Sequence, residues 1–346
     1  GQSLKTLSLD GRFREHRFWI DRLSAEFNQG EPVIVNGWLG VDKTADLKLK
    51  AEGLAVSQIN YLKDYFPGEG KLNVDVSAQG NIENPDVDGR LTVTDIKVND
   101  QALENIDLNL TLRDMQARLQ GYLNFRMDAG CDLRQGDFDA HLTFDDTETA
   151  AYFKAVGRPE LHGTLTGDVQ ADGNFRDMAN ASARVALSEL NLSFEDIPLV
   201  QSDRVALALS DQKVSIDSLD VSILTEGHLR AKGDAIIGGP AAVEIDSRIP
   251  LAVARQFSDA FGDASGWVML KGDISGETKR PQFNARLDLE NIAMTVPGLQ
   301  QQLRDLNGSI DVSATRIHTD GIKGYLDTGS FSLTGTVDHD HFEPVS

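Results

Sequence analysis

Apolar and polar residues alternate with a period of two along most of this chain. In the stretch 70–80, Leu72, Val74, Val76 and Ala78 occupy every second position, and the residues between them are polar. Because successive side chains of an extended strand point to opposite faces, this stretch predicts a strand with one apolar face and one polar face.

The same pattern returns twice. The stretch 163–173 contains Leu165 and Val169, and the stretch 266–276 contains Val268, Leu270 and Ile274. Their separation indicates a repeat of roughly 100 residues, longer than common solenoid periods but with the same consequence, a body built by stacking similar units. We expect the closing half of a repeat, three repeats and a tail, all in one continuous rod, over 1–50, 51–143, 144–247, 248–340 and 341–346.

Further alternating segments predict roughly two dozen strands in all. We expect the apolar residues of all these segments to line one shared apolar groove, together with those of the three repeated stretches. In the further segments these residues are Leu108, Leu110, Leu123, Phe125, Leu142, Leu207, Leu209, Val221, Leu287 and Leu289.

Each complete repeat opens with a short helix signal. Ser57 can cap a helix over 58–66, the middle repeat has a weaker signal over 147–156, and Pro250 suits the start of a helix containing Val253, Phe257 and Phe261. Helices of two or three turns are unstable alone, so we expect them to lie against the sheet or across its opening.

The predicted fold class is all-β with a few short helices. Barrels and sandwiches close within about 8–10 strands, so a longer array favours an elongated curled sheet, a β-taco or repeat groove with a continuous hydrophobic interior. Glycines on the inner face would leave room that side chains do not fill. These glycines are Gly121, Gly163, Gly167, Gly233 and Gly272.

Composition and net charge disfavour several kinds of partner and binding site. A net charge of −21 disfavours nucleic acid and anionic membrane surfaces as partners, and the single cysteine, Cys131, excludes an internal disulfide and thiolate metal sites. No apolar run approaches the length of a spanning helix, and Gly1 follows neither an initiator methionine nor a signal segment. We therefore expect an internal piece of a longer protein.

Catalytic chemistry is not indicated, and neither a cofactor nor a metal is predicted. The seven histidines are scattered, and Asp137 and Asp139 alternate with Phe138 and Ala140, which is typical of the solvated face of a strand. The segment 338–341, Asp-His-Asp-His, has ligands for a divalent ion, but a polar tail is the favoured interpretation. The segment 145–148 resembles the acidic first turn of a helix more than a calcium loop.

The recurring order of glycine, alternating strand, glycine, proline-containing turn and asparagine-containing segments such as 103–108 resembles the AsmA-like superfamily of bacterial envelope proteins, and most closely its TamB branch. The resemblance covers essentially the whole chain. It implies an inner-membrane anchor outside this sequence, a periplasmic location, and a hydrophobic groove for phospholipids. The TamB branch also implies a role in outer-membrane protein assembly with a barrel partner.

The favoured hypothesis is a non-enzymatic conduit whose groove holds phospholipid acyl chains. Two alternatives remain open: a scaffold for outer-membrane protein assembly by β-augmentation, and an inert β-solenoid in which the apolar stripe is a packed core. For residues such as Leu72 and Leu108, core and groove are equally good interpretations of the pattern.

Overall fold

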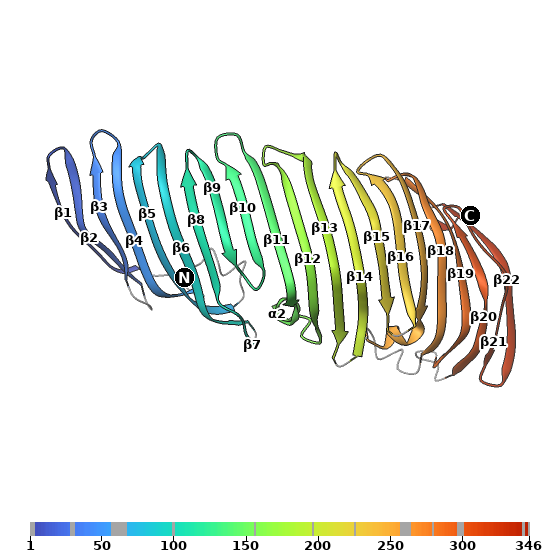
Figure 1. Cartoon of the computed structure of the whole chain (residues 1–346). Helices are drawn as coiled ribbons and strands as arrows, with labels where there is room; N and C mark the ends of the chain where they lie inside the picture. The colour runs from blue at the N-terminus through green and yellow to red at the C-terminus, as the bar shows by residue number, and fades with distance from the viewer. Residues whose placement is uncertain are drawn as a thin grey trace. The chain divides into compact units, whose positions relative to one another are not determined.

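The computed structural model describes residues 4–27, 32–56, 68–98, 101–155, 157–195, 197–224, 226–256, 264–278, 280–295, 301–340 and 343–344. Nearly all of these residues are in antiparallel β-strands (Figure 1). The chain divides into two compact units. Unit 1 comprises Gly1–His162 and Asp168–Met178, and unit 2 comprises Gly163–Gly167 and Ala179–Ser346.

Unit 1 is an antiparallel meander in which the strands from β1 to β11 pair with their neighbours in sequence order, except at β7. Its elements are β1 (Leu4–Arg14), β2 (Arg17–Phe27), β3 (Val33–Gly40), β4 (Thr44–Ala55), β5 (Gly68–Asn81), β6 (Asn84–Val98), β7 (Gln101–Ala102), β8 (Ile106–Arg113), β9 (Gln116–Tyr122), β10 (Arg126–Asp132), β11 (Asp137–Glu148) and helix α2 (Ala150–Ala155). The two-residue strand β7 pairs with the end of β6, which also pairs with β8. Strand β12 (Leu161–Asn174) and the start of β13 (Asp177–Phe194) are shared between the units.

Unit 2 continues the same antiparallel meander pattern. Its other elements are β14 (Ile197–Ser210), β15 (Lys213–Ile223), β16 (Gly227–Ile236), β17 (Pro240–Pro250), the 3-10 helix η2 (Leu251–Gln256), β18 (Ser265–Glu277), β19 (Arg280–Thr295), β20 (Gln302–Ser313), β21 (Arg316–Leu326), β22 (Gly329–Asp340) and β23 (Glu343–Pro344).

Hairpin turns are joined to one another by a regular set of backbone hydrogen bonds. In unit 1 the amide of Val41 donates to His16 (3.0 Å) and that of Ile82 to Lys43 (2.9 Å). In unit 2 the amide of Ile237 donates to Gln212 (2.8 Å) and that of Thr278 to Gly239 (2.7 Å). These bonds satisfy backbone groups at the turns and fix each hairpin to the hairpin before it.

Bulges bend the strands at similar places. Gly53, Asp95 and Asp146 in unit 1 have left-handed backbone angles (φ 64°, 53° and 47°), and so do Asn291 and Asp305 in unit 2 (φ 50° and 52°). Gly, Asp and Asn tolerate this conformation best, and an extra residue in one strand bends it and increases its twist. The local sequences therefore curl the sheet within each unit.

These observations confirm the predicted class, an all-β protein built on an open, curled antiparallel sheet with short helices. Within the described part of the chain, β1 pairs with β2 alone, so this edge is free. The predicted repeat boundaries and a continuous interior through both units remain predictions.

The three helix predictions have different outcomes. The middle helix is α2, but it begins at Ala150 rather than Thr147, because β11 runs on to Glu148. The interpretation of 145–148 as an acidic first helical turn is therefore wrong: Asp146 is a bulge residue of β11, and the first turn of α2 contains no acidic residue. Pro250 ends β17 and is followed by η2. Phe257, Phe261 and the predicted helix over 58–66 lie outside the described residues.

Candidate functional site

The strand register of unit 1 gathers the predicted lining residues into rows that cross the sheet. Directly paired residues point to the same face, so each row is continuous across its strands. Two consecutive rows read Val74, Leu91, Leu108, Gly121, Met127, Leu142 and Val76, Gly89, Leu110, Leu119, Ala129, Ala140. Every member is apolar, and we call this surface the apolar face of unit 1.

Unit 2 has an apolar face of the same construction. One row reads Val185, Leu207, Ile216, Gly233, Val243, Ile274, Phe283. Two further rows read Val221, Leu229, Ser247, Leu270, Leu287, Ile310 and Ile249, Val268, Leu289, Gly308, Ile322, Leu333. Leu209 lies in a row with Ala183 and Val214. Ser247 is the one polar member of these rows.

Strand β12 follows the same division. Asp168 lies 2.8 Å from His141, and His141 is on the polar side of β11, opposite Ala140 and Leu142. Strand alternation therefore places Leu165 and Val169 on the apolar side of β12.

The apolar residues are only partly buried. Of the predicted lining residues, Leu72 (9% exposed) and Val221 (7%) are buried, and the others keep an intermediate exposure. In a closed core, the inward-facing residues of two packed sheets interdigitate and bury one another. The side chains of this face are not buried to that extent. Most of the predicted lining residues therefore keep part of their surface accessible to solvent.

Surface area supports this conclusion. The chain exposes 20801 Å². A compact monomer of its mass exposes about 14,000 Å², and two compact domains of half that mass expose about 17,000 Å² together. An open, single-layered sheet is expected to expose more surface than a compact domain of the same mass.

The two helices whose bounds the structure gives, α2 and η2, are six residues long each. Helix α2 packs at the end of β6, where Ala151 is buried and the Tyr152 hydroxyl donates to the carbonyl of Leu123 (3.0 Å). It therefore lies at one end of the apolar face of unit 1.

Leu123 and Phe125 differ from the prediction. The pattern predicts one strand through both residues, but β9 ends at Tyr122 and β10 begins at Arg126. Asn124 between them has a left-handed backbone (φ 71°), and its side-chain amide donates to the carbonyl of Glu148 (3.0 Å). The two residues therefore belong to a turn, where Phe125 contacts Phe144 with ring centroids 4.9 Å apart.

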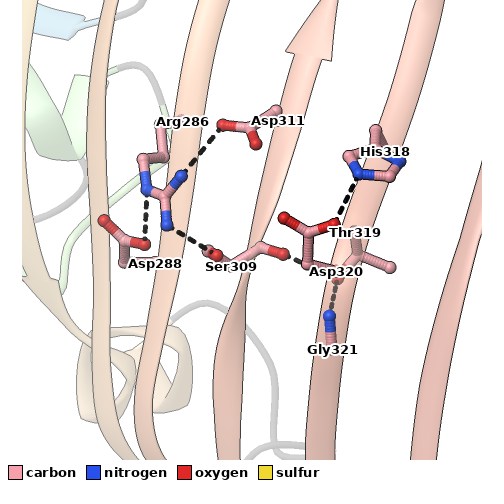
Figure 2. Close-up of polar contacts among 8 residues, drawn as sticks. All are labelled: Arg286, Asp288, Ser309, Asp311, His318, Thr319, Asp320 and Gly321. Carbon is pink, nitrogen blue, oxygen red and sulfur yellow. Dashed lines mark hydrogen bonds and ion pairs between the residues drawn. The ribbon is translucent and has the colours of Figure 1, made fainter.

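The opposite surface, the polar face, carries ladders of paired charges. In unit 2 one ladder reads Asp220, Arg230, Asp246, Lys271, Arg286, Asp311, His318. Figure 2 shows part of it: the Arg286 guanidinium lies 3.0 Å from Asp288 and 3.3 Å from Asp311, and it donates to the Ser309 hydroxyl at 2.7 Å. Each of the basic residues Arg230, Lys271 and Arg286 in this ladder thus has an acidic partner.

Unit 1 has equivalent pairs. Arg90 forms a two-pronged contact with Asp107 (2.9 and 2.5 Å), and Arg118 lies 2.7 Å from Asp128. The hydrogen bond from Arg90 lowers the pKa of Asp107, and the one from Arg118 lowers the pKa of Asp128. Both carboxylates are therefore charged at neutral pH.

Two glycines on the apolar face lie against the backbone of the neighbouring strand. A methyl group on Gly233 would lie 2.1 Å from the carbonyl oxygen of Ala242, and Gly233 has φ 134°, a value that other residues rarely adopt. A methyl group on Gly121 would lie 2.0 Å from the carbonyl oxygen of Asp107. These two glycines allow close approach of the neighbouring strand, and the room above the sheet remains a prediction.

The remaining candidate chemistry fits strand surfaces. Asp137 and Asp139 are exposed on β11, and Phe138 and Ala140 are half-buried between them. Asp338 forms an ion pair with Arg316 (2.7 Å), while His341 lies outside the described residues. A search of the described residues finds no group of side chains able to hold a metal ion.

Among the described helices, none has the length and apolar character needed to cross a membrane. Comparison of the chain with protein-family models, with curated proteins and with solved structures finds no match.

Proposed function

We propose that this chain is a non-enzymatic conduit for phospholipids, in which the apolar face of each unit shields acyl chains while headgroups stay in water. The observation that carries the proposal is the set of apolar rows, each crossing many strands and each left partly exposed. A sheet that needed these residues only as a core would bury them.

Acyl chains suit such a surface because apolar burial is non-directional. The rows present almost no polar group that a passing chain would have to desolvate, and Leu, Val, Ile and Ala predominate in them. The mechanism is diffusion along the rows, and no single residue carries it.

The resemblance to AsmA-like proteins, and to the TamB branch among them, supports the same function. On this resemblance we propose that the chain lies in the periplasm of a bacterial envelope, as part of a protein anchored in the inner membrane, and that phospholipids move along it toward the outer membrane. A barrel partner for the TamB branch would contact regions outside this sequence.

Native mass spectrometry of protein purified without detergent tests the proposal. We expect phospholipid to remain bound and to be recovered by solvent extraction. A lipid-free protein whose apolar face does not take up phospholipid from vesicles would contradict the conduit and support an inert rod. Bound peptide at a strand edge, with no lipid, would instead support a scaffold for strand addition.

A further inference from the structure

A cavity of about 560 Å³ opens at the ends of strands β8 to β11, beside helix α2. This volume lies in the range of small-molecule sites, which is about 300–1,000 Å³. Its apolar wall is formed by Ile96, Ala102, Leu103, Ile106, Leu123, Phe125 and Ala151. Ile106 begins the strand that carries Leu108 and Leu110, so the cavity adjoins the apolar face of unit 1.

The polar wall of the cavity is acidic. Glu104, Asp145, Asp146 and Glu148 line it, and none of the described lining residues is Lys, Arg or His. The charge of the wall is therefore complementary to a cation, and an apolar floor beside it suits an amphiphile rather than a free ion.

Two tyrosines add to this complementarity. The Tyr122 hydroxyl donates a hydrogen bond to Glu104, which raises the pKa of Tyr122, and the Tyr152 hydroxyl donates to the carbonyl of Leu123. Their rings line the cavity together with Phe125. Aromatic rings next to carboxylates are a favourable environment for an ammonium group.

A positive charge lies directly beside the acidic wall. Arg126 is paired with Tyr122 across β9 and β10, and its side chain is exposed. Its guanidinium is close enough to Tyr122 to lower the pKa of the phenol, against the larger effect of Glu104. An acidic pocket with an arginine at its side matches the charges of a zwitterion whose ammonium and phosphate are a few bonds apart.

We propose that this cavity binds the headgroup of a zwitterionic phospholipid, with its ammonium between Glu104 and the tyrosines, its phosphate toward Arg126 and its acyl chains entering the apolar face at Ile106 and Phe125. The inference rests on the proposed function and adds a headgroup preference to it. It makes the end of the apolar face in unit 1 a selective entry or holding site.

The test compares two lysolipids of equal chain, myristoyl lysophosphatidylethanolamine and myristoyl lysophosphatidylglycerol, each titrated below its micelle-forming concentration. We expect wild-type protein to prefer the ethanolamine lipid by about tenfold, and the Glu104→Gln/Asp145→Asn variant to lose most of that preference. The matched control, Glu83→Gln/Asp86→Asn, removes two carboxylates at the opposite end of β6.

The control matters because a chain of net charge −21 repels any anionic lipid. Loss of preference in the cavity variant, with preference kept in the control, supports the headgroup site. Equal effects in the two variants, or equal affinity of wild-type protein for both lysolipids, would overturn the site while leaving the conduit intact. Binding of neither lysolipid would overturn both proposals.

Discussion

The two faces of the sheet are built from the same strands, yet they satisfy their side chains in different ways. On the polar face, cross-strand neighbours such as Arg90 and Asp107, or Arg286 and Asp311, pair with each other. On the apolar face, cross-strand neighbours such as Leu91 and Leu108 touch each other but retain exposure to solvent. Charges can be satisfied within one layer, whereas apolar surface needs a second layer to leave water.

This difference indicates on which face a ligand gains the most binding free energy. A molecule that docks on the polar face must displace water and compete with existing ion pairs, which contribute little individually. An acyl chain on the apolar face removes surface from water at about 25 cal/mol per Å² without breaking any protein contact. The comparison can be tested by exchanging the character of one face at a time.

The largest effect is expected from a charge on the apolar face. Leu110→Asp places a carboxylate in the row of Leu119 and Ala129. Because Leu110 is partly exposed, the carboxylate can reach water when no lipid is bound, so folding should survive, while lipid binding should fall by at least tenfold through desolvation of the charge. Lipid retention by native mass spectrometry and the circular dichroism spectrum measure the two effects.

Asn109→Asp is the matched control for this variant. Asn109 is the preceding residue of β8, is exposed on the polar face and is paired with Arg90. We expect lipid binding equal to wild type. Comparable losses of lipid in both variants would mean that the two faces do not differ in function.

A smaller effect is expected from a glycine that shapes the apolar face. Gly233→Ala introduces a methyl group against the Ala242 carbonyl and forces an unfavourable φ, so we expect a loss of about 1 to 3 kcal/mol of stability. The thermal midpoint measures it. Gly335→Ala is the control, because a methyl group there meets nothing within 4 Å and its φ is unrestricted. An unchanged midpoint for Gly233→Ala would contradict the close strand approach.

The smallest effect is expected on the polar face. In Arg90→Gln, Asp107 loses the partner that lowers its pKa. A carboxylate with a lower pKa in the folded than in the unfolded chain adds stability that is complete above the unfolded pKa and is lost as pH falls through the folded pKa. The variant should therefore have a slightly lower melting temperature than wild type at neutral pH. This difference in melting temperature should disappear at a pH below the usual pKa of aspartate.

The difference in melting temperature should be small, because both side chains are well exposed to water. Dissolved salt screens ion pairs of this kind. A difference that widens as the pH is lowered would contradict the assigned pairing. High salt should narrow it at neutral pH.

Most of the sheet could be predicted from the sequence, because its signal is local. Leu72, Val74 and Val76 alternate with polar neighbours, and alternation alone assigns a face to each residue once the strand is extended. The register between strands was not needed to divide the two faces, since each strand carries its own apolar side.

The failures occur where one residue leaves the extended conformation. Asn124 turns the chain between Leu123 and Phe125, and Asp146 makes a bulge before Thr147. The sequences around Asp95, Asp146 and Asn291 share an Asp or Asn before a buried residue, Ile96, Thr147 or Ile292. The burial is known only from the structure, and the same dipeptides occur elsewhere, as at Asn105-Ile106 and Asp273-Ile274, so the sequence alone does not identify these positions. The cavity beside α2 could not have been predicted, because turns far apart in sequence form it.

Site-specific photo-crosslinking tests the central claim most directly. A photoreactive residue is placed on the apolar face at Leu110 or Leu207, and on the polar face at Asn109 or Arg230, in cells that synthesise the protein. The account predicts that the first two positions capture phospholipid and the last two do not. Equal capture from both faces, or none from the apolar face, would contradict it.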